Sequence, residues 1–281
     1  LTAAVINGVI GSGIFGLPAV LAALTGVLSP LAALAAGGGI LLIVLCFAEV
    51  GSRFREHGGV YLYARAAYGP LVGFEVGWLL IWTRLLSAAA NLNLFVLYLG
   101  ELWPELAIGA PRAIVMTALV ATIAVTNVVG VRSATWSIDA FTIAKLVPLA
   151  LLIVLGLPQV DGEVIATQAV ADPDWTQAVL VMMFAFGGFE SALLPAGEMR
   201  DPKRDIGFAL LVGLAVIATV YLLVQLVVIG TVAHAGETKA PLAQALGVLL
   251  GPPGVVLASV AAMISVYGWT TGATLAQPRV I

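Results

Sequence analysis

The sequence predicts an all-α integral membrane protein, and three observations lead to this fold class. Only 10% of the 281 residues are charged, whereas soluble domains carry roughly 25%. Mean hydropathy is high, at +1.10. The apolar residues form continuous runs of about 20, the length of a membrane-spanning helix, and not the alternating runs of about ten that build a transmembrane β-barrel.

Eight apolar runs are long enough to cross a bilayer. The first, third and seventh are long enough to include turns at the membrane interface. In chain order we place the spans at residues 1–24, 30–50, 70–99, 113–131, 138–157, 175–199, 206–233 and 255–275. The chain opens inside the first run with no basic segment or cleavable signal peptide, and it stops just past the eighth. We therefore expect that residues are missing from both ends. The single cysteine, Cys46, excludes a disulfide within the chain.

The connecting segments carry their basic residues on one side of the membrane. Eight spans place both ends of the chain on the same side. The basic residues expected there are Arg53, Arg55, Arg65, Arg132, Arg200, Lys203, Arg204 and Arg279, against Arg112 and Lys239 on the other side. Because cytoplasmic loops are enriched in Lys and Arg, we expect both ends to be cytoplasmic, in the plasma membrane.

The first span contains a stretch that does not suit a membrane helix, GVIGSGIFGLPA at residues 8–19, here called the first break. Glycine lets the chain leave the helix at low cost, and Pro18 is expected to begin a new helix. In hydrocarbon the freed backbone groups must find partners, so such breaks occur inside protein or beside a cavity. The alternative is that these glycines allow close helix packing.

The sixth span has a matching stretch, FAFGGFESALLPA at residues 184–196, here called the second break. Two breaks five spans apart favour an inverted repeat with a site at its interface. We expect residues 1–157 to form the first repeat and residues 158–281 an incomplete second one. Helix N-termini attract a carboxylate, and freed carbonyls at helix C-termini attract an ammonium. A zwitterionic amino acid would satisfy both.

Several motifs resemble the amino acid–polyamine–organocation superfamily of amino acid permeases. They are GSGIF at residues 11–15, AEVGSRF at 48–54, GGVYLY at 58–63, FGGFES at 186–191 and EMRDPKR at 198–204. The resemblance covers the whole chain and implies a LeuT-like fold of five plus five spans with spans one and six broken. Family members usually have twelve spans, so this chain would match spans one to eight.

The resemblance also implies a substrate site at the two breaks. Amides of Gly11, Ser12 and Gly13 would hold the substrate carboxylate, and Phe184 would act as a gate. Carbonyls would hold the ammonium, at Val9, Phe184, Ala185 and Gly187. Side chains near the site would set selectivity, the candidates being Thr83, Ser87, Phe189, Ser265 and Tyr267. To these we add Arg84, which is an ionisable residue within the third span and is less expected from the resemblance.

Three ionisable residues inside spans are further candidates, because a charge there costs several kcal/mol, roughly 2.5–3.5 on insertion scales. Lys145 would carry a proton or replace a cation at the first break, as the resemblance implies; the alternative is a lysine reaching the cytoplasmic interface. Glu190 would couple protons or pin the broken helix by a hydrogen bond. Arg84 would bind an acidic substrate group or pair with an acid on another helix.

The function that these features favour is secondary active transport of amino acids by alternating access. A neutral substrate and proton-coupled symport are the expected forms. The alternatives are exchange of amino acids or polyamines, and a fragment without transport because its last spans are missing. The sequence has no HExxH, GxSxG or phosphate-loop motif, so we expect no enzyme. The expected partners are the substrate, protons and the lipid bilayer, with no nucleic acid, cofactor or bound metal.

Overall fold

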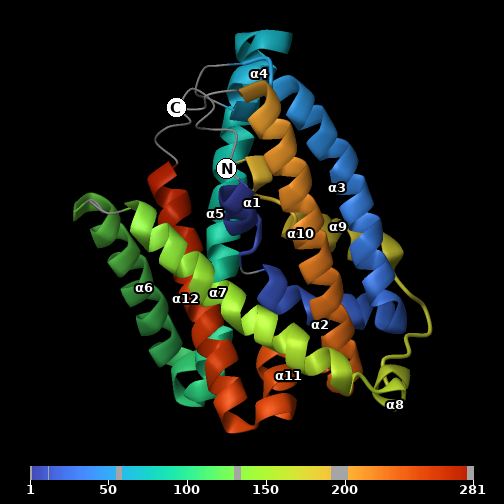
Figure 1. Ribbon diagram of the computed structural model, residues 1–281. Coiled ribbons are helices and arrows are strands. Elements are labelled where there is room, and N and C mark those ends of the chain that lie inside the picture. The colour runs from blue at the N-terminus through green and yellow to red at the C-terminus, as the bar shows by residue number, and fades with distance from the viewer. Residues whose placement is uncertain (1, 12, 55–58, 130–133, 191–201, 277–281) are drawn as a thin grey trace.

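The structure is a computed structural model that describes residues 2–11, 13–54, 59–129, 134–190 and 202–276. Every regular element in these ranges is helical, which confirms the predicted all-α class (Figure 1). The α-helices are α1 (Thr2–Val9), α2 (Gly13–Thr25), α3 (Ser29–Gly51), α4 (Gly59–Tyr68), α5 (Pro70–Leu102), α6 (Gly109–Val129), α7 (Ala134–Gly156), α8 (Gly162–Ala166), α9 (Trp175–Ala185), α10 (Pro202–Thr231), α11 (Pro241–Leu250) and α12 (Pro252–Ala276).

The long helices lie where the hydropathy runs place the spans. Within the described residues, five segments are long and apolar enough to cross a membrane: 13–51, 70–102, 109–128, 206–231 and 252–271. The first of these contains both α2 and α3. Helix α9 ends after 11 residues because the second break begins there, and α11 has only 10 residues, which is too short to span. Helices α4, α8 and α11 lie in the connecting segments between the predicted spans.

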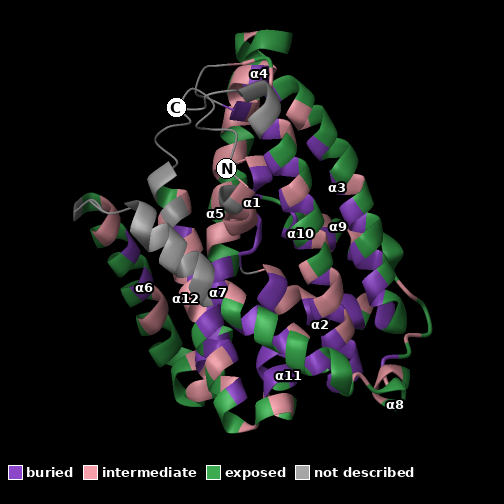
Figure 2. Ribbon diagram, viewed as in Figure 1, coloured by how far each residue is buried: buried purple, intermediate pink, exposed green. Residues whose placement is uncertain are grey.

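The outer surface of the bundle is apolar, as a surface in contact with lipid must be. Large side chains such as Leu42, Leu71 and Val128 are 67%, 70% and 87% exposed. Figure 2 shows exposed residues over much of α6 and the outer side of α3. Soluble proteins rarely expose so much contiguous apolar surface, so the fold is that of an integral membrane protein.

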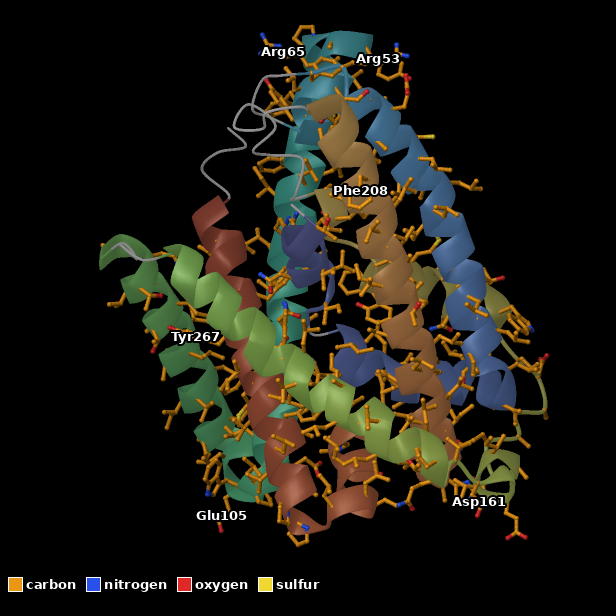
Figure 3. The ribbon with its side chains drawn as sticks, in the orientation of Figure 1. Arg53, Arg65, Glu105, Asp161, Phe208 and Tyr267 are labelled. Atoms are coloured by element: carbon orange, nitrogen blue, oxygen red, sulfur yellow. The ribbon has the colours of Figure 1, made fainter. Side chains whose placement is uncertain are left out.

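Helix α10 forms the centre of the bundle and contacts α1, α2, α3 and α7. Its buried residues recur at helical spacing along one face, at Ile206, Leu210, Ile217, Val224 and Val228. The opposite face is also apolar, as the exposed Phe208 illustrates (Figure 3). A helix that is apolar all round is typical of a membrane span that packs on protein with one side and on lipid with the other.

Charged residues separate to the two ends of the bundle. Figure 3 shows Arg53 and Arg65 at one end and Glu105 and Asp161 at the opposite end. These two basic and two acidic residues thus lie at opposite ends of the bundle, and the cytoplasmic orientation of the basic end stays a prediction.

The helix after the first break is held by two buried polar side chains. The Tyr98 hydroxyl of α5 donates to the Phe15 carbonyl at 2.6 Å, and the Tyr98 ring packs edge-on against Phe15. The Gln225 amide of α10 donates to the Pro18 carbonyl at 3.1 Å. Helix α2 begins at Gly13, so Pro18 lies inside the helix. The prediction that Pro18 begins it was therefore wrong, because Gly13 already adopts the helical conformation.

We expect Tyr98→Phe to destabilise the protein by about 1–3 kcal/mol, because it leaves the buried Phe15 carbonyl without this donor. The measurement is thermal unfolding of the purified full-length protein in detergent. The control is Tyr68→Phe, since Tyr68 is 75% exposed and its hydroxyl can bind water. Equal melting temperatures for the two variants would contradict the prediction.

Candidate functional site

The first break interrupts the helix between Val9 and Gly13. The Gly11 amide donates to the Val9 carbonyl at 2.7 Å and so closes a tight turn. Gly13 begins α2, and amides in the first turn of a helix have no acceptor within it. The predicted carboxylate-binding set thus changes, since the Gly11 amide is already engaged, Gly13 keeps a suitable position, and Ser12 lies outside the described residues.

The second break follows α9. The chain turns at residues 186–188, where the Gly187 amide donates to the Phe184 carbonyl at 3.0 Å. Gly188 has a φ of +112°, a conformation that residues with a Cβ rarely adopt. Its amide donates to the Glu190 carboxylate at 2.9 Å. The Leu-Pro-Ala part of the second break lies outside the described residues.

The two breaks touch each other through glycine backbone. A Cβ placed on Gly188 would lie 2.4 Å from the Gly8 carbonyl oxygen, so only glycine fits there. Tyr221 of α10 joins the same two segments, since its hydroxyl lies 3.2 Å from the Val9 carbonyl and 2.9 Å from the Ala185 carbonyl. The breaks, far apart in the sequence, therefore form one unit at the centre of the bundle.

The carbonyls at the first break are all engaged by other helices. Each carbonyl from residue 7 to residue 11 has a donor from α7, α10 or α12. The donors are Lys145 for Asn7 and Ile10, Trp269 for Gly8, the Tyr221 hydroxyl for Val9 and the Ser265 hydroxyl for Gly11. The freed acceptors of the broken helix are thus satisfied by tertiary contacts, as a membrane interior requires.

Lys145 supplies two of these bonds from within the bundle. Its ammonium lies 2.8 Å from the Asn7 carbonyl oxygen and 2.5 Å from that of Ile10, and the residue is 2% exposed. These acceptors lie at the C-terminal end of α1, where the helix dipole favours a cation. The side chain therefore points to the first break and not to the cytoplasmic interface, which was the alternative interpretation.

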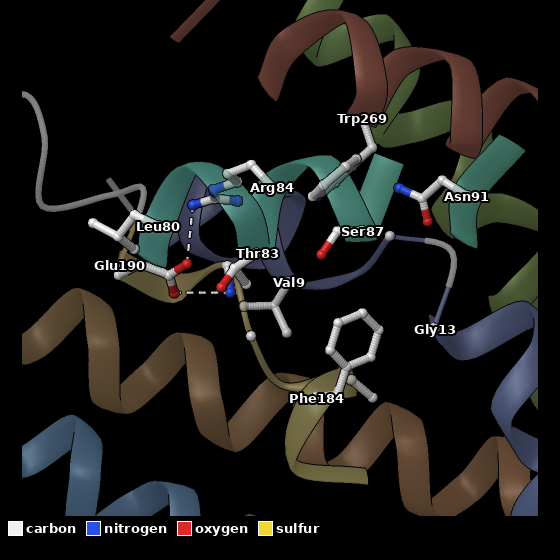
Figure 4. Close-up of a pocket in the computed structure, with 14 residues that line it drawn as sticks. Val9, Gly13, Leu80, Thr83, Arg84, Ser87, Asn91, Phe184, Glu190 and Trp269 are labelled. Carbon is white, nitrogen blue, oxygen red and sulfur yellow. Dashed lines mark hydrogen bonds and ion pairs between the residues drawn. The ribbon is translucent and has the colours of Figure 1, made fainter. Parts of the chain in front are cut away.

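A cavity of about 120 Å³ lies between the two breaks and α5 (Figure 4). It is lined by Val9, Gly11, Gly13, Leu80, Thr83, Arg84, Ser87, Asn91, Phe184, Ala185, Gly187, Gly188, Glu190 and Trp269. Helix α5 contributes residues 80, 83, 84, 87 and 91, a spacing that puts them on one face of a helix. The cavity thus brings together most of the residues that the sequence analysis proposed for the site.

Phe184 and Phe189 take different positions. The Phe184 ring faces the cavity and the residue is 53% exposed (Figure 4). Phe189 is buried, and its ring packs edge-on against Phe47 of α3, with centroids 5.4 Å apart. The structure therefore corrects the proposal that Phe189 sets selectivity, because its side chain belongs to the apolar core and does not line the cavity. Tyr267 does not line the cavity either.

Arg84 and Glu190 form an ion pair on the cavity wall. Arg84 Nη2 lies 2.9 Å from Glu190 Oε1, and the other carboxylate oxygen accepts the Gly188 amide. Of the two interpretations for Arg84, the structure supports pairing with an acid on another segment. For Glu190 the structure shows the hydrogen bond that pins the second break.

Comparison with known proteins agrees with this arrangement. The family model for amino acid permeases matches residues 1–281. The chain belongs to the amino acid permease family. The chain is 30% identical to the serine/threonine exchanger SteT of Bacillus subtilis over 98% of this chain and 64% of that protein. It is 32% identical to a putative arginine/ornithine antiporter of Escherichia coli K12 over 96% of this chain and 64% of that protein.

A third relative is an uncharacterized transporter of Mycobacterium tuberculosis H37Rv, which is 25% identical over 98% of this chain and 63% of that protein. The chain thus spans just under two thirds of the length of these relatives. The match starts at residue 1 and includes both breaks.

Sequence reasoning missed several side chains of this site, among them Leu80, which lines the cavity. Tyr221 and Trp269 donate to backbone carbonyls, and Asn91 lines the cavity. The available signal was a polar or aromatic residue inside an aliphatic span. That signal is weak, because hydropathy does not show which face of α10 or α12 points to the breaks.

We expect Gly188→Ala to lower stability by about 2–4 kcal/mol and to abolish transport, because the added Cβ would clash with the Gly8 carbonyl and strain the backbone. The measurements are the melting temperature and substrate uptake of the full-length protein. Gly38→Ala is the matched control, since a Cβ there meets nothing within 4 Å. A Gly188→Ala protein with wild-type stability and uptake would show that the breaks do not need this close approach.

Proposed function

We propose that the full-length protein is a secondary active transporter that moves amino acids across the plasma membrane by alternating access. The observation that carries this proposal is a cavity of about 120 Å³ that residues of both broken helices line. The start of α2 offers amides and a positive helix end near Gly13, which suit a carboxylate. Phe184 and Gly187 of the second break line the same cavity, and carbonyls freed at the end of α9 would suit an ammonium.

In this proposal Phe184 closes the cavity toward the outside. The repeats at residues 1–157 and 158–281 move relative to each other around the site, and the basic end of the bundle faces the cytoplasm. Val9 and Ala185 also line the cavity, but the Tyr221 hydroxyl lies within hydrogen-bond distance of both of their carbonyls. A substrate ammonium would have to displace this hydroxyl or share the two carbonyls with it.

The position of Lys145 supports amino acid transport that is not coupled to sodium ions. Its ammonium bonds to two carbonyls of the first break, where a cation would otherwise neutralise the C-terminal end of α1. We infer that Lys145 either remains as a fixed cation or exchanges a proton during the cycle. Proton-coupled symport requires the second role, with Glu190 as a further candidate for proton transfer.

Exchange is the second candidate function, and the names of two relatives favour it. One is called a serine/threonine exchanger and the other a putative arginine/ornithine antiporter. Symport and exchange both require a cavity that binds an amino acid, so measurements of uptake must distinguish them.

Proteoliposomes that contain the full-length protein should take up labelled amino acid saturably, without sodium. For symport, an inward proton gradient should drive accumulation into empty vesicles. For exchange, uptake should require unlabelled amino acid inside, with little effect of the gradient. Vesicles without protein are the control. If none of the twenty amino acids is taken up saturably under either condition, the proposed function is rejected.

Lys145→Ala should reduce uptake about tenfold or more, because two carbonyls at the first break lose a charged donor. The remaining uptake should no longer depend on pH if Lys145 carries the proton. The control is Lys239→Ala, since Lys239 is exposed in a connecting segment. Uptake by Lys145→Ala that keeps the wild-type pH dependence would reject the proton role and leave only the fixed-cation role.

A further inference from the structure

The charge of the cavity wall comes from one ion pair. Arg84 and Glu190 are the only residues with a formal charge among the described residues that line the cavity. The ammonium of Lys145 points instead to backbone carbonyls of the first break. The wall therefore carries one positive and one negative charge, and it has no net charge.

The pair is accessible from the cavity. The side chains of Arg84 and Glu190 are 21% and 22% exposed, and their separation is 2.9 Å. The Glu190 carboxylate has one donor on each oxygen, from Arg84 and from the Gly188 amide. An ion pair that served only to join two segments could be fully enclosed, but this one forms part of the surface that a bound molecule touches.

The position of the pair places it near the side chain of a bound amino acid. Gly13 and Asn91 lie on one side of the cavity and the ion pair on the other (Figure 4). Arg84 and Asn91 are two helical turns apart on α5, or about 10 Å along its axis. A substrate whose carboxylate lies at Gly13 extends past Ser87 toward the pair.

A charged side chain at this position would disturb the pair. A cationic group would compete with Arg84 for the carboxylate and be repelled by the guanidinium, and an anionic group would be repelled by Glu190. In a partly dehydrated site, splitting an ion pair leaves one charge without compensation, which strongly disfavours binding. An uncharged side chain leaves the pair intact, and the hydroxyls of Thr83 and Ser87 offer it polar contacts.

We propose that the Arg84–Glu190 ion pair determines substrate specificity and selects amino acids whose side chains carry no charge. This inference rests on the proposed transport function. It specifies which residues set the substrate class, and it predicts how the class changes when either charge is removed.

The test is competition in counterflow, which needs no ion gradient and so is insensitive to a coupling role of Glu190. Proteoliposomes with the full-length protein exchange a labelled amino acid that the wild type carries, and unlabelled serine, leucine, arginine or glutamate competes. Serine or leucine should compete with the wild type at a concentration about tenfold or more below that of arginine and glutamate.

Removing one charge of the pair should allow amino acids of one charge sign to compete, and the sign depends on which charge is removed. Glu190→Gln removes the negative charge of the pair and leaves Arg84 on the cavity wall, so glutamate should compete about tenfold better than with the wild type. In Arg84→Gln, arginine should compete better than with the wild type by a similar factor. The double variant Arg84→Gln/Glu190→Gln restores a wall without net charge and should again prefer uncharged amino acids. Arg53→Gln, which breaks the exposed Arg53–Glu49 pair, is the control and should leave the order unchanged.

An unchanged order of competitors in both single variants would overturn the inference, because a purely structural pair would affect stability and not the order. If the variants do not fold, thermal unfolding of the wild-type protein still tests the inference. Its melting temperature should rise more with serine or leucine than with arginine or glutamate, and the opposite order overturns the inference. The proposed transport function fails separately, when no amino acid is exchanged or stabilises the protein.

Discussion

The bonding of the backbone carbonyls at the first break is the constraint on which the rest of the site depends. A helix that is interrupted within a membrane frees acceptors that water cannot reach, and each unsatisfied one costs several kcal/mol. Here the carbonyls from residue 7 to residue 11 receive donors from three helices. Helices α7, α10 and α12 are thereby tied to the broken segment. A movement of any of them must break or exchange these hydrogen bonds.

The close contact between Gly8 and Gly188 gives the two breaks a common geometry. Because the backbones meet without side chains between them, the start of α2 and the end of α9 open into one cavity. Tyr221 reinforces this contact, and Glu190 extends it to α5 through Arg84. The cavity therefore joins the ends of two broken helices to an ion pair, and the proposed binding of a zwitterion rests on this distribution of charge.

Much of the fold follows from local sequence patterns. Continuous apolar runs predict the spans because the bilayer has a fixed thickness, and clustered glycines predict the breaks because glycine permits a departure from helix. Lys145 stood out since a lysine within a span needs a partner. The side chains that were missed or misplaced, Tyr221, Trp269 and Phe189, are ordinary residues for a membrane helix. Their importance depends on which side of the helix faces the breaks, and an all-round apolar helix gives no indication of that side.

The sequence by itself determined the class of the protein, the long apolar runs, the positions of the two breaks and the ionisable residues within those runs. These properties depend on composition and on short-range geometry, which neighbouring residues define. Only the tertiary structure decided that Arg84 pairs with Glu190, that Lys145 bonds to the first break, that the Gly11 amide is engaged and that Phe189 lies in the core. Arg84 and Glu190 are 106 residues apart, and their contact depends on how α5 rotates about its axis and on the path that the chain takes after α9. That rotation results from the summed packing of the whole bundle, so no local pattern specifies it.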